Sequence, residues 1–197
     1  LNPDAFPEPT WLEELLAAAA RWPHAAAFGS TQIAADAPER FDGLGDCYSL
    51  WGLPWRGGFG WPRATTPLIE GEVFSPCAAA ALYRAEAWRA MGGFDAQLFC
   101  YCEDVDLGFR LRLAGYACVQ APRAIVTHVS GGTAGRRSAF ATFYGARNRL
   151  WVYVKNMPLP LLLFTAPVHA VATLALLSAA VLRGVGASTF NGLLAGV

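Results

Sequence analysis

The chain has 197 residues, of which 54% are hydrophobic and 15% are charged. This length indicates one domain or most of one. The apolar content excludes an intrinsically disordered chain, because enough surface can be buried to offset the entropy lost on ordering. The five cysteines are an odd number and include no C-x-x-C pair. A disulfide scaffold and a zinc ribbon are therefore not expected, and a reducing compartment fits better.

The net charge is zero, but the charges are distributed unevenly. All 15 acidic residues lie between Asp4 and Asp106, whereas nine of the 15 basic residues lie from Arg110 onward. This asymmetry indicates a metal-binding or acid–base front half and a back half facing an anion, such as a diphosphate or a cytoplasmic lipid surface. A nucleic-acid partner is not expected, because the basic residues form no dense run with aromatics.

The first half of the chain alternates apolar runs with helical patterns. We expect a helix over 10–22, capped by its first residue, a threonine, and then a buried strand over 25–33. The glycine-rich stretch 36–67 is typical of a functional loop. An apolar strand over 73–83 and a short helix over 84–91 follow.

The second half continues this alternation. The pattern predicts an amphipathic helix over 104–114, strands over 118–119 and 124–129, and a helix over 138–156. Strands that alternate with helices indicate a layered α/β fold.

The segment 159–182 contains no charged residue and is long enough to cross a bilayer. More basic residues precede it than follow it, which predicts a cytoplasmic front domain. Two prolines and a histidine interrupt the segment, so a buried or interfacial helical hairpin is the alternative.

Asn2 and Asp4 lie two residues apart in an extended stretch, so their side chains point the same way. Such a pair can hold a hard divalent cation together with diphosphate oxygens. The alternative is an ordinary turn, for which Asn-Pro-Asp is a common sequence.

Three carboxylates, those of Glu103, Asp104 and Asp106, stand at the start of a predicted helix. They can cap the helix and complement its dipole. Three acids in four positions exceed what a cap requires, however, so the segment is also a candidate general base.

His128 follows an apolar strand and precedes a glycine turn, so it is either a structural histidine or a metal ligand beside bound phosphates. Arg136 and Arg137 come next. Their planar guanidinium groups suit a leaving diphosphate, and the alternative is an exposed charged loop. Aromatic residues between the glycines of 51–61, Trp55 among them, suit sugar or lipid stacking or simply pack the loop onto the core.

Taken together, several motifs resemble family 2 glycosyltransferases, most closely the bacterial rhamnosyltransferase-like branch. The motifs are Gly92-Gly93-Phe94-Asp95, the run 99–107 containing Glu103-Asp104-Val105-Asp106, Arg110-Leu111-Arg112, Gly115-Tyr116, His128, Arg147-Asn148-Arg149 and Lys155-Asn156-Met157-Pro158. The opening Leu-Asn-Pro-Asp is also similar to that family. The resemblance covers roughly residues 1 to 158.

The resemblance implies the metal- and acceptor-binding part of a Rossmann-like GT-A domain over 1–157, followed by an apolar, membrane-associated or transmembrane helical segment over 158–197. It implies an inverting enzyme that transfers a sugar from a nucleotide-diphosphate donor to the hydroxyl of a saccharide or lipid-linked acceptor. The family's habits place this reaction in cell-envelope synthesis at the cytoplasmic face of the membrane.

The resemblance also assigns roles to single residues. Asn2 and Asp4 occupy the family's D-x-D position at the metal and donor diphosphate, with Asn2 departing from the usual first aspartate. Asp104 matches the catalytic base, and Glu103 and Asp106 would support it. His128 matches a position that can contribute to the metal, which is Mg²⁺ or Mn²⁺.

The resemblance places the acceptor site near Gly93, Phe94 and Asp95, and we expect the aromatic loop around Trp55 to shape acceptor choice. Arg136 and Arg137 would neutralise the donor diphosphate.

The family's nucleotide-binding half would precede Leu1, so we expect an amino-terminal truncation and a chain that is inactive by itself. A non-catalytic, membrane-associated sugar-binding scaffold of the same fold is the alternative, and it predicts loss of the base or metal residues. A polymerising synthase is less consistent, because no Q-x-x-R-W segment follows the candidate base.

Overall fold

The computed structural model describes residues 1–129 and 138–196. The chain divides into two compact units, which are described separately. The first unit comprises Leu1–Cys47, Trp55–Phe94 and Asp104–Ser130, and the second comprises Tyr48–Pro54, Asp95–Glu103 and Gly131–Val197.

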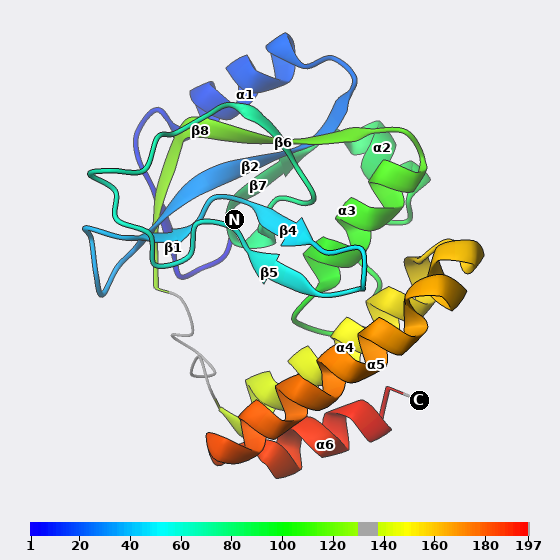
Figure 1. Cartoon of the computed structure of the whole chain (residues 1–197). Coiled ribbons are helices and arrows are strands. Elements are labelled where there is room, and N and C mark those ends of the chain that lie inside the picture. Colours follow the sequence, from blue (N-terminus) through cyan, green and yellow to red (C-terminus); the bar gives the residue numbers. More distant parts are fainter. Residues whose placement is uncertain (130–137, 197) are drawn as a thin grey trace. The chain divides into compact units, whose positions relative to one another are not determined.

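The first unit is built on a six-stranded mixed sheet whose two long central strands, β2 and β8, run parallel (Figure 1). Antiparallel β3 and β7 pair with β2, and antiparallel β1 and β6 pair with β8. A two-stranded sheet joins β4 to β5. The strands are β1 (Ala5–Pro7), β2 (Ala25–Ala34), β3 (Phe41–Gly43), β4 (Asp46–Tyr48), β5 (Pro54–Arg56), β6 (Gly71–Val73), β7 (Ala81–Tyr83) and β8 (Ala117–His128).

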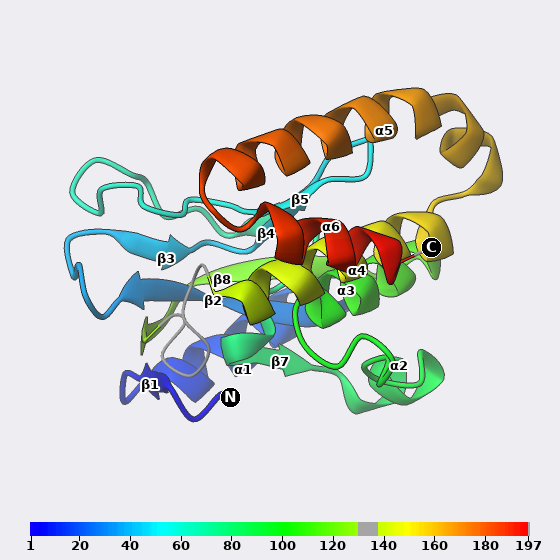
Figure 2. The same ribbon diagram turned by 90° about the horizontal axis from the view of Figure 1, so that it is seen from below.

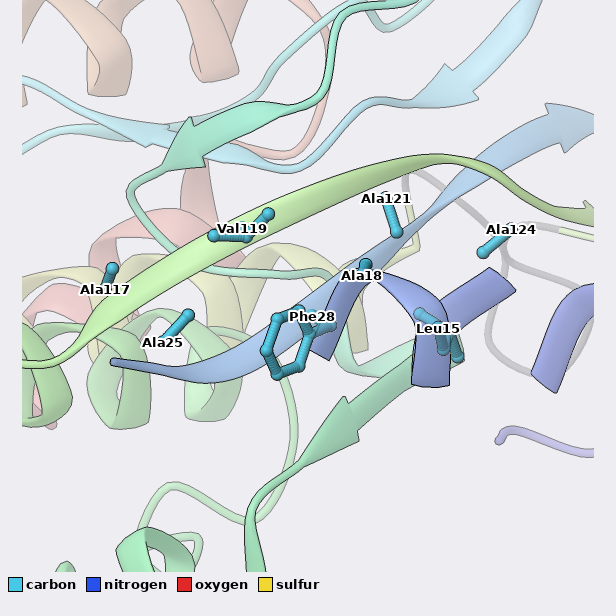
Figure 3. Packing of buried hydrophobic residues seen from close by; sticks show 8 residues of the cluster. All are labelled: Leu15, Ala18, Ala25, Phe28, Ala117, Val119, Ala121 and Ala124. Atoms are coloured by element: carbon cyan, nitrogen blue, oxygen red, sulfur yellow. The ribbon is translucent and has the colours of Figure 1, made fainter. Parts of the chain in front are cut away.

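Helices cover both faces of the central strands. On one face, Leu15 and Ala18 of α1 (Trp11–Arg21) pack against Phe28 of β2 and Val119 of β8 (Figure 3). Ala27, the neighbour of Phe28, belongs to a second cluster with residues of α2 (Ala85–Ala90) and α3 (Glu103–Leu113). Since successive strand residues point to opposite faces, this cluster lies on the other side of the sheet.

The strand β8 contains an irregularity at Pro122. Ser30 of β2 pairs with Ala121, but the next residue of β2, Thr31, pairs with Ile125. The Thr31 hydroxyl donates a 2.9 Å hydrogen bond to the Pro122 carbonyl, which fixes this bulge. Ala121 and Ala124 consequently face the same cluster although they are three residues apart.

The second unit contains three helices, α4 (Ala139–Asn156), α5 (Leu159–Leu182) and α6 (Gly186–Leu194), of which α6 packs against both α4 and α5 (Figures 1 and 2). The rings of Tyr153 in α4 and His169 in α5 stack with centroids 3.8 Å apart. The Tyr153 hydroxyl also lies 2.8 Å from that of Thr165. Among the described residues, α5 is the helix that is long and apolar enough to cross a membrane, and only 11% of its most apolar window is buried.

The α/β class and the apolar carboxyl-terminal helix agree with the sequence prediction. The single strand predicted over 73–83 is wrong, because Pro76 and a short 3₁₀ helix, η1 (Ala78–Ala80), separate β6 from β7. The two strands predicted around Pro122 are one strand, because the bulge accommodates the proline. Thr10 precedes α1 but its hydroxyl makes no capping hydrogen bond. The predicted loop over 36–67 contains β3, β4 and β5.

Candidate active site

The pairing of β1 with β8 brings Asp4 beside His128 at one end of the sheet. Ala5 is the register partner of His128, and the carbonyl of Asp4 accepts a hydrogen bond from the backbone N–H of Val129. The Asp4 carboxylate oxygen Oδ1 lies 3.6 Å from His128 Nε2. The predicted metal-site pair is therefore brought together by strand register.

The other ring nitrogen of His128 is held by a buried carboxylate. His128 Nδ1 lies 2.7 Å from Oδ2 of Asp42 in β3, and Asp42 is fully buried. The same oxygen accepts a 3.0 Å hydrogen bond from Nη1 of Arg56 in β5. In the neutral form of the ring, the carboxylate on Nδ1 makes that nitrogen the hydrogen-bond donor. Nε2, which faces Asp4, then carries the lone pair.

Asp4 and His128 could supply two of the ligands of a hard divalent cation. Two ligand atoms about 2.1 Å from one cation lie roughly 3.0–3.6 Å apart at bond angles between 90° and 120°, which includes the Asp4–His128 separation. Within residues 1–129 and 138–196, no group of three or more His, Cys, Asp or Glu side chains could hold a metal. A cation held by this pair would therefore need further ligands from outside these side chains, such as water, which Mg²⁺ usually retains.

Arg56 connects this pair to the neighbouring loop. Its Nη2 lies 3.0 Å from Sγ of Cys77, and its Nε lies 3.9 Å from Oδ1 of Asp46. Burial raises the pKa of the Cys77 thiol to about 12. Cys77 therefore remains a neutral thiol at physiological pH and is not suited to be a nucleophile.

Asp104 stands in the first turn of α3, where backbone N–H groups hold its carboxylate. Oδ2 accepts a 3.0 Å hydrogen bond from the N–H of Ala78 in η1, and Oδ1 accepts one from the N–H of Val105. Each oxygen retains a lone pair, because a carboxylate oxygen can accept two hydrogen bonds. The side chain is thus fixed in direction and still able to accept a proton from a hydroxyl.

Asp106 has a different environment from Asp104. It is fully buried and forms a 2.7 Å ion pair with Arg110 of the same helix. Arg110 also donates to the carbonyls of Met91 and Gly93. Asp106 therefore supports the segment 91–93 through Arg110, its i,i+4 partner in α3. Glu103 is the first residue of α3 and is half-buried.

The predicted acceptor residue Gly93 forms a turn with a positive φ of 69°, which favours glycine. A Cβ atom at this position would lie 3.0 Å from the Trp88 ring. The ring of Phe94 packs edge-to-face on Trp88 with centroids 4.7 Å apart. These residues form one rigid aromatic corner of the first unit.

The remaining predicted donor and acceptor residues are not all brought together. Trp55 is 53% exposed in β5, and Asn2 is exposed at the start of the chain. Asp95 belongs to the second unit, where its carboxylate pairs with Lys155 at 2.6 Å. Arg136 and Arg137 lie outside the described residues.

The segment before Asp104 has an unusual backbone. Phe99, Tyr101 and Cys102 have φ values of 63–66°, in the left-handed region that non-glycine residues rarely adopt. The buried Asn148 of α4 donates hydrogen bonds of 2.7–2.8 Å to the carbonyls of Leu98, Cys100 and Tyr101. Strained backbone of this kind concentrates at functional sites and persists only where its surroundings enforce it.

Sequence reasoning gave no role to Asp42, Arg56 or Asn148. Asp42 and Arg56 lie in a glycine-rich stretch where many polar residues are expected, so nothing local distinguished them. Asn148 was noted within the family motif Arg147-Asn148-Arg149. An asparagine in a predicted helix interior is a weak helix former, and this was the one local signal that its side chain has a tertiary partner.

Comparison with known proteins identifies the class that this fold and site define. Residues 60–157 match the family described as "Glycosyltransferase like family 2". The chain is a member of glycosyltransferase family 2, as its motifs indicated.

Within this family, the chain is similar to an N-acetylglucosaminyl-diphospho-decaprenol L-rhamnosyltransferase from two strains of Mycobacterium tuberculosis, CDC 1551 / Oshkosh and ATCC 25618 / H37Rv. In each case the sequences are 36% identical over 156 residues, which cover 70% of this chain and 48% of the relative. The chain thus spans about half the length of the curated relatives it matches. It is a rhamnosyltransferase-like member of the family.

Proposed function

We propose that this chain supplies the metal- and acceptor-binding part of an inverting glycosyltransferase that acts in cell-envelope polysaccharide or glycolipid synthesis. The donor is a nucleotide-diphosphate sugar, and the acceptor is a hydroxyl of a saccharide, either free or lipid-linked. The relatives, which are named for a diphospho-decaprenol acceptor, support a lipid-linked acceptor.

The observation that carries this proposal is the fixed carboxylate of Asp104 in the same compact unit as the Asp4–His128 pair. Direct inversion needs a base that takes the proton of the attacking hydroxyl and a stabilised diphosphate on the opposite side. Asp104 would accept that proton. Asp4 and His128 would hold Mg²⁺ or Mn²⁺, which when bound supplies positive charge at the departing diphosphate.

The apolar helix α5 supports a position at the cytoplasmic face of the membrane. Its 24 residues contain no charge, and most of its large side chains are exposed. An apolar surface of this extent is typical of a membrane-contacting segment.

The test is Asp104→Asn in the full-length protein, assayed for donor binding and for sugar transfer. Transfer is expected to fall by about 10²- to 10⁴-fold, because the substitution removes a general base. Donor binding is expected to stay within about twofold, because the amide keeps the size of the carboxylate and the proposed donor contacts are made by other residues.

Glu86→Gln is the matched control, since Glu86 is an exposed carboxylate in the first turn of another helix, α2. It should leave both quantities unchanged. Unchanged transfer by Asp104→Asn would sink the assignment of the base and favour a non-catalytic, sugar-binding scaffold.

A further inference from the structure

The second unit contains a cavity of about 360 Å³ among α4, α5 and α6. Its walls are mainly small or apolar, with Gly145 and Ala146 from α4 and Leu176 and Ala180 from α5. Cys102, two residues before Asp104 in the sequence, also lines it. The cavity is large enough for a phosphate group together with the first carbon atoms of an attached chain.

Two arginines, Arg149 of α4 and Arg183 at the end of α5, are the charged residues among those that line the cavity. Arg149 is partly buried, and this burial lowers the pKa of its guanidinium group. Within residues 1–129 and 138–196, no carboxylate forms an ion pair with either arginine. An arginine that loses part of its hydration is usually paired with an acid, so an unpaired one that lines a cavity indicates an anionic ligand.

The charge of the second unit favours the same ligand. Asp95 and Glu103 are its acidic residues, against six arginines and lysines. Asp95 is already paired with Lys155. The hydroxyls of Thr142 and Thr189, which also line the cavity, lie within hydrogen-bond distance of the backbone carbonyls four residues earlier in their helices. The anion would therefore be bound chiefly by the two guanidinium groups.

We propose that this cavity binds the phosphate or diphosphate that joins an acceptor sugar to its lipid carrier. This inference rests on the proposed transferase function and names a binding site for its acceptor. The two arginines would be sufficient to bind a simple anion. The apolar walls of the cavity and the exposed apolar surface of α5 favour a phosphate that carries a hydrocarbon chain. Planar guanidinium groups match phosphate oxygens in a bidentate manner.

The experiment measures binding of farnesyl diphosphate, a short prenyl diphosphate, to the chain in nonionic detergent by isothermal titration calorimetry, without donor. The wild-type chain should bind it. Inorganic diphosphate, which lacks the hydrocarbon chain, and farnesol, which lacks the diphosphate, should each bind at least about tenfold more weakly. Arg149→Met should weaken binding of farnesyl diphosphate by about 10- to 100-fold, the expected loss for charge-assisted hydrogen bonds. Arg149→Lys should weaken this binding less than Arg149→Met, because lysine keeps the positive charge.

The matched control is Arg89→Met, since Arg89 is an exposed arginine of the first unit, and binding should not change. Thermal unfolding separates a binding role from a structural one. Removal of an unpaired, partly buried cation should leave the melting temperature of Arg149→Met equal or higher, whereas removal of a structural arginine would lower it.

Wild-type affinity in Arg149→Met would overturn the proposal. Equal affinity for inorganic and farnesyl diphosphate would overturn the lipid part, leaving a site for free diphosphate. Asp104→Asn should bind farnesyl diphosphate normally. The binding measurement therefore tests the proposed lipid-phosphate site, and the transfer assay of Asp104→Asn separately tests the proposed base.

Discussion

The buried carboxylate of Asp42 determines how His128 is presented to Asp4. It lies 2.7 Å from Nδ1 of His128 and also accepts a hydrogen bond from Arg56. Residues that orient a metal-binding histidine in this way commonly contribute 10- to 100-fold to metal affinity. Asp42 is therefore a positioning residue for the proposed cation.

Asp42→Asn should weaken Mn²⁺ binding by about tenfold or more, because the neutral amide holds the imidazole less strongly. Mn²⁺ binding can be measured by electron paramagnetic resonance, and circular dichroism would check the fold. Asp36→Asn changes a carboxylate in the loop before β3 and serves as the control. An Mn²⁺ affinity unchanged by Asp42→Asn would show that Asp42 does not orient the histidine.

Two buried cysteines, Cys77 and Cys118, are expected to lower the free energy of unfolding at alkaline pH. Burial raises the pKa values of the Cys77 and Cys118 thiols to about 12. Below about pH 8.5 these thiols are protonated in both the folded and unfolded chains. As the pH rises toward 12, the unfolded chain ionises and the folded chain does not, so the free energy of unfolding falls.

Each such thiol contributes a slope of about 1.4 kcal/mol per pH unit over this interval. Cys118→Ala should therefore flatten the pH dependence of the unfolding free energy above pH 9 by about that amount. Urea unfolding at a series of pH values would measure it. Parallel curves for the variant and the wild type would contradict a raised pKa at Cys118.

At the scale of elements, α4 holds the strained segment 98–102 through Asn148. Three left-handed, non-glycine residues cost of order 1 kcal/mol or more each, and hydrogen bonds from one amide group compensate for them. The exposed ring of Phe99 contacts Tyr144 of α4, with centroids 5.4 Å apart. Helix and segment therefore form one structural element within the second unit.

Asn148→Ala should lower the free energy of unfolding by about 3 kcal/mol, because the carbonyls of Leu98, Cys100 and Tyr101 lose their shared donor. Hydrogen exchange of residues 97–102 should rise as well. Asn191→Ala, at an exposed position of α6, is the control and should change stability by less than about 0.5 kcal/mol. Unchanged exchange in 97–102 would show that Asn148 does not hold the segment.

The sequence predicted the helices of more than ten residues well and the three-residue strands poorly. The segment 159–182 is a single helix with those bounds and not the alternative hairpin, with Pro160 in its first turn and Pro167 inside it. β6 and β7 were merged, because a strand of three residues has no periodicity to recognise. The proximity of Asp4 and His128 and the partnership of Asp42 arise from strand pairing across the sheet, which local patterns do not encode.

At the scale of the whole molecule, charge and hydrophobicity are segregated along the chain. The acidic residues end at Asp106, and the second unit combines basic residues with the exposed apolar surface of α5. A surface with both properties is attracted to anionic bilayers by electrostatics and held there by apolar burial. Membrane contact is therefore predicted for the second unit.

Phe164→Glu tests this prediction, since Phe164 is 78% exposed on α5. The substitution should weaken partitioning onto phosphatidylglycerol-containing vesicles by about tenfold or more, because it removes a large apolar group and adds a repelled charge. Flotation of the chain with these vesicles would measure it. Leu12→Glu, on α1 of the first unit, should have little effect, and equal losses from both would contradict a specific role for α5.

The bulge of β8 has a consequence for how this sequence can evolve. Beyond the bulge, Ala124, Val126 and His128 stand at alternate positions and share one orientation. Losing or gaining one residue between Ile125 and His128 would turn His128 to the opposite face of the strand, away from Asp42. Descendants of this gene should therefore accept single-codon insertions or deletions at 122–124, where the bulge can absorb them, far more readily than at 125–127.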